Sequence, residues 1–98
     1  MKTRNPRGQL GRAFSIIAQH QMREWDMHAD VRAWGAPSEC HDLVNRGAAR
    51  RERAAYAHAS AVSGLKRQHL RKAFDAMPIR QYERLCAAVE EARTHRHA

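Results

Sequence analysis

Residues 56–75 read YAHASAVSGLKRQHLRKAFD and contain the turn that decides the fold of this 98-residue chain. An alanine-rich segment of high helix propensity comes first, Ser63-Gly64 interrupts it, and a basic amphipathic segment follows. Glycine readily adopts the left-handed backbone conformation that a tight interhelical turn needs. The pattern therefore predicts one helix over residues 48–62 and a second over residues 65–77.

The same stretch can be aligned with a helix-turn-helix motif. In that motif a small residue in the first helix lets the second helix approach, a glycine allows the turn, and apolar residues anchor the second helix while its outer face enters the major groove. The residues in these roles would be Ser60, Gly64, Leu65, Leu70 and Ala73. Because Ser63 stands where an apolar residue is usual, an ordinary interhelical turn remains the alternative.

The outer face of the second helix carries side chains suited to DNA. Arg67 and Arg71 are predicted to pair with guanine edges, and Gln68 with adenine. Lys66 and Lys72 are predicted to hold phosphates. The preceding helix and the N-terminal arm are predicted to add contacts with the DNA backbone. The residues are Arg50, Arg51, Arg53, Arg4, Arg7 and Arg12.

Working outward, the first nine residues are predicted to form a basic flexible arm, because Asn5-Pro6 and Gly8 interrupt any regular pattern. A broad apolar stripe at helical spacing predicts a long helix over residues 10–34, with Trp25 and Trp34 in the core, or as interface anchors if exposed. Residues 35–37 (Gly-Ala-Pro) should end that helix and Ser38 should cap the next. We expect Gly47 to end this short helix, and the alternative is a glycine tolerated within one longer helix.

The last segment predicts a helix that begins near Pro78, where a missing N–H costs nothing. Its apolar line suits pairing with another helix, either inside the domain or across the two-fold axis of a homodimer. That line consists of Ile79, Tyr82, Leu85, Cys86 and Val89. The predicted fold is thus all-α: a compact bundle of four to five helices over residues 10–94, between the arm and a frayed tail at residues 95–98.

The chain has 18 Lys plus Arg against 10 Asp plus Glu, a formal charge of +8. Such a surface attracts polyanions, with nucleic acid first among them, followed by an acidic protein face or an anionic membrane surface. The ratio of 15 arginines to 3 lysines and the abundance of alanine are also what GC-rich coding bias produces. No membrane span is expected, because the apolar stretch at residues 14–18 is short. Two distant cysteines, Cys40 and Cys86, favour a reduced, cytoplasmic setting.

Seven histidines raise the question of a metal site. His20, Glu24 and His28 share one helical face, but they span about 12 Å of helix axis, too far to meet at one ion. Cys40-His41 is a pair of soft ligands without a second pair. No metal or cofactor is predicted, and without a phosphate loop or nucleophile motif no enzymatic activity is predicted either.

These patterns predict a small basic protein that binds nucleic acid, and double-stranded DNA is the favoured ligand. The protein is predicted to be a homodimer that acts in transcription regulation. The alternative is a helical protein-interaction module. An example would be a mobile-element accessory factor that inhibits or recruits a larger nucleoprotein complex.

Overall fold

The structure is a computed structural model that describes residues 6–35 and 37–97, with side chains described over 8–35 and 37–94. Four α-helices and no strand occur within these residues. The helices are α1 (Pro6–Ala33), α2 (Ser38–Ser63), α3 (Arg67–Asp75) and α4 (Ile79–His97). The all-α prediction is confirmed, with the lower of the two expected helix numbers.

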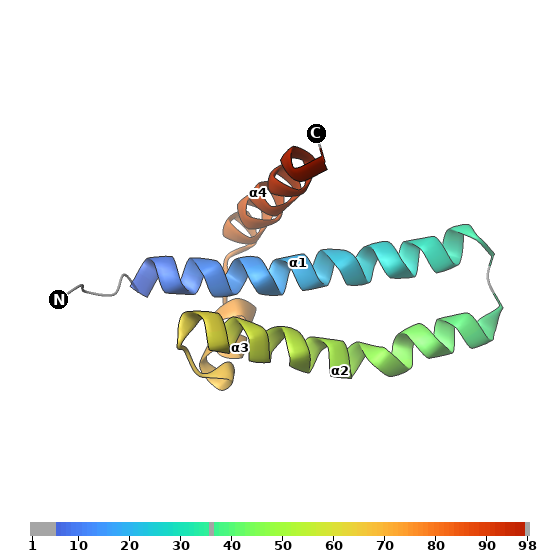
Figure 1. Cartoon of the computed structure of the whole chain (residues 1–98), viewed down its shortest axis with the longest axis horizontal. Helices are drawn as coiled ribbons and strands as arrows, with labels where there is room; N and C mark the ends of the chain where they lie inside the picture. The colour runs from blue at the N-terminus through green and yellow to red at the C-terminus, as the bar shows by residue number, and fades with distance from the viewer. Residues whose placement is uncertain (1–5, 36, 98) are drawn as a thin grey trace.

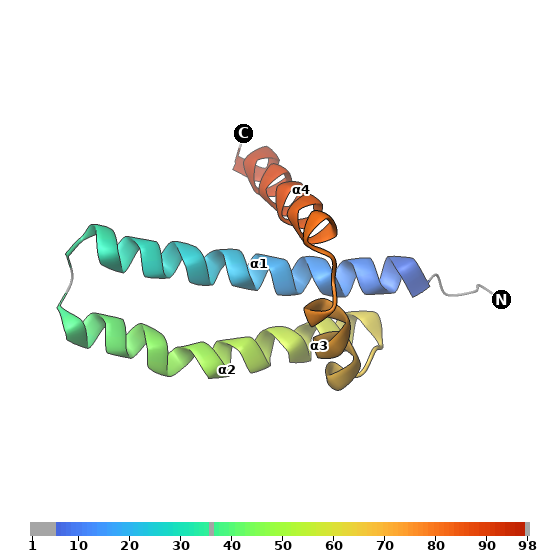
Figure 2. The same ribbon diagram turned by 180° about the vertical axis from the view of Figure 1, so that it is seen from behind.

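The two long helices form an antiparallel hairpin (Figure 1). After α1 ends at Ala33, Gly35 takes a φ of 62°, the left-handed region that glycine tolerates and that lets the chain reverse. The short helix α3 lies at the end of α2, against the N-terminal half of α1 (Figures 1 and 2). Helix α4 crosses α1 on the side opposite to α2.

The core lies where α1, α2 and α3 meet. Phe14 and Phe74 pack edge to face with ring centroids 5.6 Å apart, and Tyr82 packs in the same way on Phe74 at 5.8 Å. Such pairs add to the stabilisation that comes from burying the rings. The other buried members are small or aliphatic, with the exception of Tyr56: Ala13, Ile17, Tyr56, Ala59 and Leu70. This small core holds α1, α2 and α3 together at one end of the hairpin.

Helix α4 is attached to α1 by polar as well as apolar contacts. The hydroxyl of Tyr82 donates a hydrogen bond to Gln21 Oε1 at 2.6 Å, and Arg93 pairs with Asp26 at 3.2 Å. Val89 is buried, with 4% of its surface exposed. Burial, together with the neighbouring Cys86 thiol, raises the pKa of Tyr82 to about 12. The apolar line of α4 is therefore used inside the chain.

Several predicted boundaries are wrong. Helix α2 runs through Gly47 without a break, and its N-cap position is Pro37, so that Ser38 is its first residue and caps nothing. Helix α1 begins at Pro6, within the segment predicted as an arm. Residues 1–5 lie outside the described residues, and so does Ala98 of the predicted frayed tail.

The molecule is longer than a compact bundle of its size. Its principal extents are 56 × 32 × 24 Å and its Cα radius of gyration is 15.4 Å, whereas a compact chain of this length has a radius of about 13 Å. We call residues 23–46, where α1 ends and α2 begins, the hairpin end. Trp25 and Trp34, predicted in the core, lie here with 54% and 80% of their surface exposed. No helix in the described part of the chain is long and apolar enough to cross a bilayer.

Candidate nucleic-acid interface

The corner between α2 and α3 is formed by only three residues, Gly64 to Lys66. Gly64 has a φ of 77° and donates its N–H to the carbonyl of Ser60 at 2.8 Å, which closes α2. The Ser60 hydroxyl donates to the carbonyl of Leu65 at 2.6 Å. The buried Ser63 hydroxyl accepts the N–H of Leu65 at 3.1 Å and donates to the carbonyl of Ala59. Two serines thus satisfy the polar backbone of Leu65.

Helix α3 has one apolar side and one cationic side. Leu70 is fully buried and Phe74 nearly so, which fixes the inner face of the helix against the core. The helix begins at Arg67, two residues later than predicted, with Lys66 in an extended conformation at the N-cap. No side chain caps this end, and its first turn carries no acid. Its N–H groups and partial positive charge are therefore available to an anion.

A hollow of about 530 Å³ lies beside α3 and is called the α2–α3 hollow below. One residue of α2 and five of α3 line it: Arg53, Arg67, Gln68, Arg71, Lys72 and Asp75. Five of the six are among the predicted nucleic-acid-binding residues. Four cationic side chains against one carboxylate make this hollow an attractive site for a polyanion.

Arg71 is held in a defined position at the hollow. Its Nη1 pairs with Glu52 at 3.0 Å, and its guanidinium lies 4.3 Å from the centroid of the Tyr56 ring. Burial raises the pKa of Tyr56, which keeps its hydroxyl uncharged. Within the described part of the chain, the other cations of the hollow, Arg53, Arg67 and Lys72, form no ion pair. These three are free to meet phosphate.

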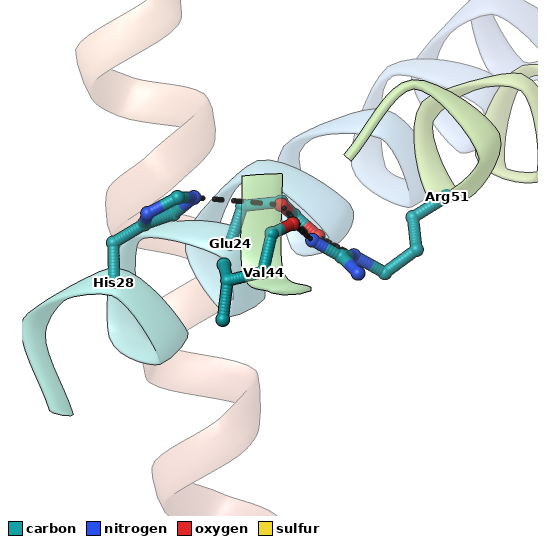
Figure 3. Close-up of polar contacts among 4 residues, drawn as sticks. All are labelled: Glu24, His28, Val44 and Arg51. Carbon is teal, nitrogen blue, oxygen red and sulfur yellow. Dashed lines mark hydrogen bonds and ion pairs between the residues drawn. The ribbon is translucent and has the colours of Figure 1, made fainter. Parts of the chain in front are cut away.

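Arg51 does not belong to this surface, although it was predicted to contact phosphate. Its guanidinium lies inside the hairpin, where Nε donates to Glu24 and Nη2 donates to Glu24 Oε1 at 3.0 Å and to the carbonyl of Val44 at 2.7 Å (Figure 3). The hydrogen bond from Arg51 lowers the pKa of the Glu24 carboxyl below its ordinary value. Arg51 is therefore a structural residue that joins α1 to α2.

Gly47 explains how the guanidinium fits. A Cβ atom at this position would clash with Arg51 Nη1, so another residue would force the end of this flexible side chain to shift, whereas glycine leaves it in place one helical turn later. The sequence contained this signal, since a glycine stood four residues before an arginine inside a strong helix pattern. The partner Glu24, 27 residues away, could not be identified without the fold.

The remaining predicted residues are divided among different places. Arg50 is exposed on α2 outside the hollow, and Lys66 is exposed at the corner. Arg4 and the side chain of Arg7 lie outside the described residues. The predicted dimer line of α4 faces inward at Tyr82 and Leu85, which pack against the core, and at the buried Val89, and it is half-buried at Cys86. Only Ile79, 68% exposed, is left open.

The described residues show no arrangement of side chains that suits metal binding. Among the described residues, no three His, Cys, Asp or Glu side chains come together as ligands for one metal ion. The hollow offers cationic and amide groups, which suit the recognition of phosphate and base edges. No protein-family description, curated protein or solved structure matches this chain.

Proposed function

We propose that this protein binds double-stranded DNA through the α2–α3 hollow, with α2 and α3 acting as a helix-turn-helix-like element. The observation that carries the proposal is the hollow itself. Its cations come from two helices that a corner of three residues holds together, and a turn of three to four residues with a glycine is the usual connection in such motifs. We further propose that it acts as a homodimer in regulation.

The first turn of α3 supports this proposal. Its N–H groups have no capping side chain, and Lys66 and Arg67 flank them. Cations at a helix N-terminus interact unfavourably with the helix dipole, and a bound phosphate relieves that cost. Arg67 and Gln68 are then the residues for base edges, while Arg53 and Lys72 are the residues for phosphates.

The aromatic residues favour a duplex over a single strand. Proteins that bind single strands stack the bases on exposed aromatic rings. The aromatic ring that contacts the hollow's Arg71 is Tyr56, which is 5% exposed and covered by that guanidinium. A surface without a stacking platform suits the regular phosphate spacing of a duplex.

The test is binding of labelled duplex DNA, followed by fluorescence anisotropy at several salt concentrations. We expect sub-micromolar affinity at about 0.15 M salt that falls steeply as salt rises. Lys72→Ala should weaken binding to all sequences and reduce the salt slope by about 1, and Arg67→Ala should also relax sequence preference. Arg80→Ala, an exposed arginine on α4, is the matched control and should change little.

Absence of binding at every salt concentration would remove the proposal, and so would an equal loss for Arg80→Ala and Lys72→Ala. The alternative, a protein-interaction module, makes a different prediction. Affinity purification from the native host would then recover a stoichiometric protein partner that nuclease treatment does not release.

A further inference from the structure

The hairpin end has almost no core of its own. Among the described residues 27–35 and 37–46, not one is buried, whereas Phe14 and Tyr56, toward the opposite end of the same two helices, belong to the buried core. At the inner edge of the hairpin end, Trp25 packs on Tyr82 with ring centroids 6.5 Å apart. Large apolar side chains are exposed here: Trp34 at 80%, Leu43 at 64% and Trp25 at 54%. Helix α4 reaches Trp25 and Asp26, but the exposure of Trp34 and Leu43 shows that no third helix covers these two side chains.

The apolar side chains follow a pattern on each helix. Met27, Val31 and Trp34 are spaced i, i+4 and i+7 along α1, which places them along one side of that helix. Trp34 continues the helical pattern, because its N–H donates to the carbonyl of Asp30. Cys40 and Val44 are half-buried near the start of α2. A pair of antiparallel helices with half-covered apolar sides is half of a four-helix bundle.

The distribution of charge along the chain indicates which partner can cover this surface. The hairpin end carries three arginines against five carboxylates, while the remaining residues with described side chains carry eleven cations against five carboxylates. Two copies of a chain with a formal charge of +8 repel each other most at their cationic ends. The hairpin end is where a second copy can approach at the lowest electrostatic cost.

The hairpin end also carries charged side chains of both signs. Glu24 and Asp26 are already paired within the chain. Within the described residues no ion pair forms at the acids Asp30, Glu39 and Asp42, or at the bases Arg23, Arg32 and Arg46. Because a two-fold interface brings each patch against itself, a patch with unpaired charges of both signs can form complementary pairs with its copy.

We propose that the hairpin ends of two copies pack against each other, with Trp34 and Leu43 as the apolar anchors, to form a four-helix homodimer. This interface does not use α4, whose apolar line is already packed on α1. The two α3 helices then lie toward the outer ends of the dimer, because α3 is at the opposite end of the hairpin (Figure 1). The interface does not depend on the DNA-binding proposal.

Sedimentation equilibrium of the full chain without nucleic acid tests this interface. We expect the wild-type chain to dimerise, and Trp34→Ala with Leu43→Ala to weaken the dimer by at least about 30-fold, as loss of a buried aromatic anchor does. The matched control is Val62→Ala with Ile79→Ala, two exposed apolar residues outside the hairpin end, which should leave the dimer unchanged. Circular dichroism should show the same helix content in all three proteins.

A second measurement locates the interface without removing the anchor. In a Trp25→Phe chain, Trp34 is the single tryptophan, so its emission should shift to shorter wavelength and resist quenching as concentration rises through the dimerisation range. Leu43→Ala in this background should delay both changes to higher concentration. A wild-type chain that stays monomeric at millimolar concentration overturns the proposal and leaves this surface to a different protein. So does a dimer in which Trp34 remains fully quenchable.

Discussion

Gly47 and Arg51 show how one glycine can serve an interhelical ion pair. Glycine in the interior of a helix costs about 1 kcal/mol relative to alanine. Here it leaves the space in which the Arg51 guanidinium reaches Glu24 and the carbonyl of Val44. Charge-assisted hydrogen bonds are worth roughly 1.5–3 kcal/mol each when shielded, and less at a partly exposed pair such as this one.

Gly47→Ala should therefore change the free energy of unfolding by less than about 0.5 kcal/mol, because the roughly 0.5–1 kcal/mol that alanine gains in a helix is offset by the shift forced on the guanidinium. Gly11→Ala is the matched control, since no atom lies within 4 Å of a Cβ there, and it should stabilise the chain by about 0.5–1 kcal/mol. Urea unfolding measures both. In an Arg51→Ala background Gly47→Ala should give the full gain of about 0.5–1 kcal/mol, and a gain no larger than in the wild type would contradict the steric explanation.

The Glu24 carboxyl also gives a pH dependence with a definite sign. Arg51 lowers the pKa of this group in the folded chain below its ordinary value of 4.5, so its contribution to stability is fully present above that value. The contribution is lost as the pH falls toward the pKa of the folded state. The difference in unfolding free energy between wild type and Glu24→Gln should shrink as the pH falls from 6 to 3. A difference that grows would contradict the ion pair.

At the level of elements, the α2–α3 corner is set by side chains rather than by glycine alone. Ser63→Ala removes the buried acceptor of the Leu65 N–H and should destabilise the chain by roughly 1–2 kcal/mol. Hydrogen exchange of the Leu65 amide should become faster. Ser38→Ala is the matched control, because Ser38 makes no capping hydrogen bond, and its unfolding free energy should stay within about 0.5 kcal/mol of wild type. Equal effects at both serines would show that the corner does not depend on Ser63.

Element types were predictable from the sequence, whereas the extent of their packing was not. The apolar stripe of α1 correctly predicted a helix and the burial of Phe14 and Ile17. The same stripe led to the wrong prediction of buried Trp25 and Trp34, because α3 is only nine residues long and covers one end of the hairpin. A periodic pattern identifies the side of a helix that needs a partner but not the length of that partner.

The candidate site was predictable in part for the same reason. Arg53, Arg67, Arg71 and Lys72 line one hollow because their spacing along α2 and α3 follows from helix periodicity and a short turn. The inward position of Arg51 depends on Glu24 in another helix, and sequence spacing holds no information on that contact.

At the level of the whole molecule, the elongated outline is a measurable property. The Trp34→Ala, Leu43→Ala chain is expected to be a monomer, and its small-angle scattering should give a radius of gyration clearly above the value of about 13 Å for a compact chain of this length. The long hairpin, whose far end has no third helix against it, is the reason. A value near 13 Å would show that the hairpin end folds back on the body.

The separation of charge along the hairpin has a consequence for approach before any contact forms. Acidic groups predominate at one end of a molecule 56 Å long and cationic groups at the other, which gives the chain a large permanent dipole moment. In the field of any polyanion the molecule experiences a torque as well as an attraction. A single chain therefore turns α3 toward the polyanion, whereas in the proposed dimer the two moments oppose each other and one α3 helix faces outward at each end.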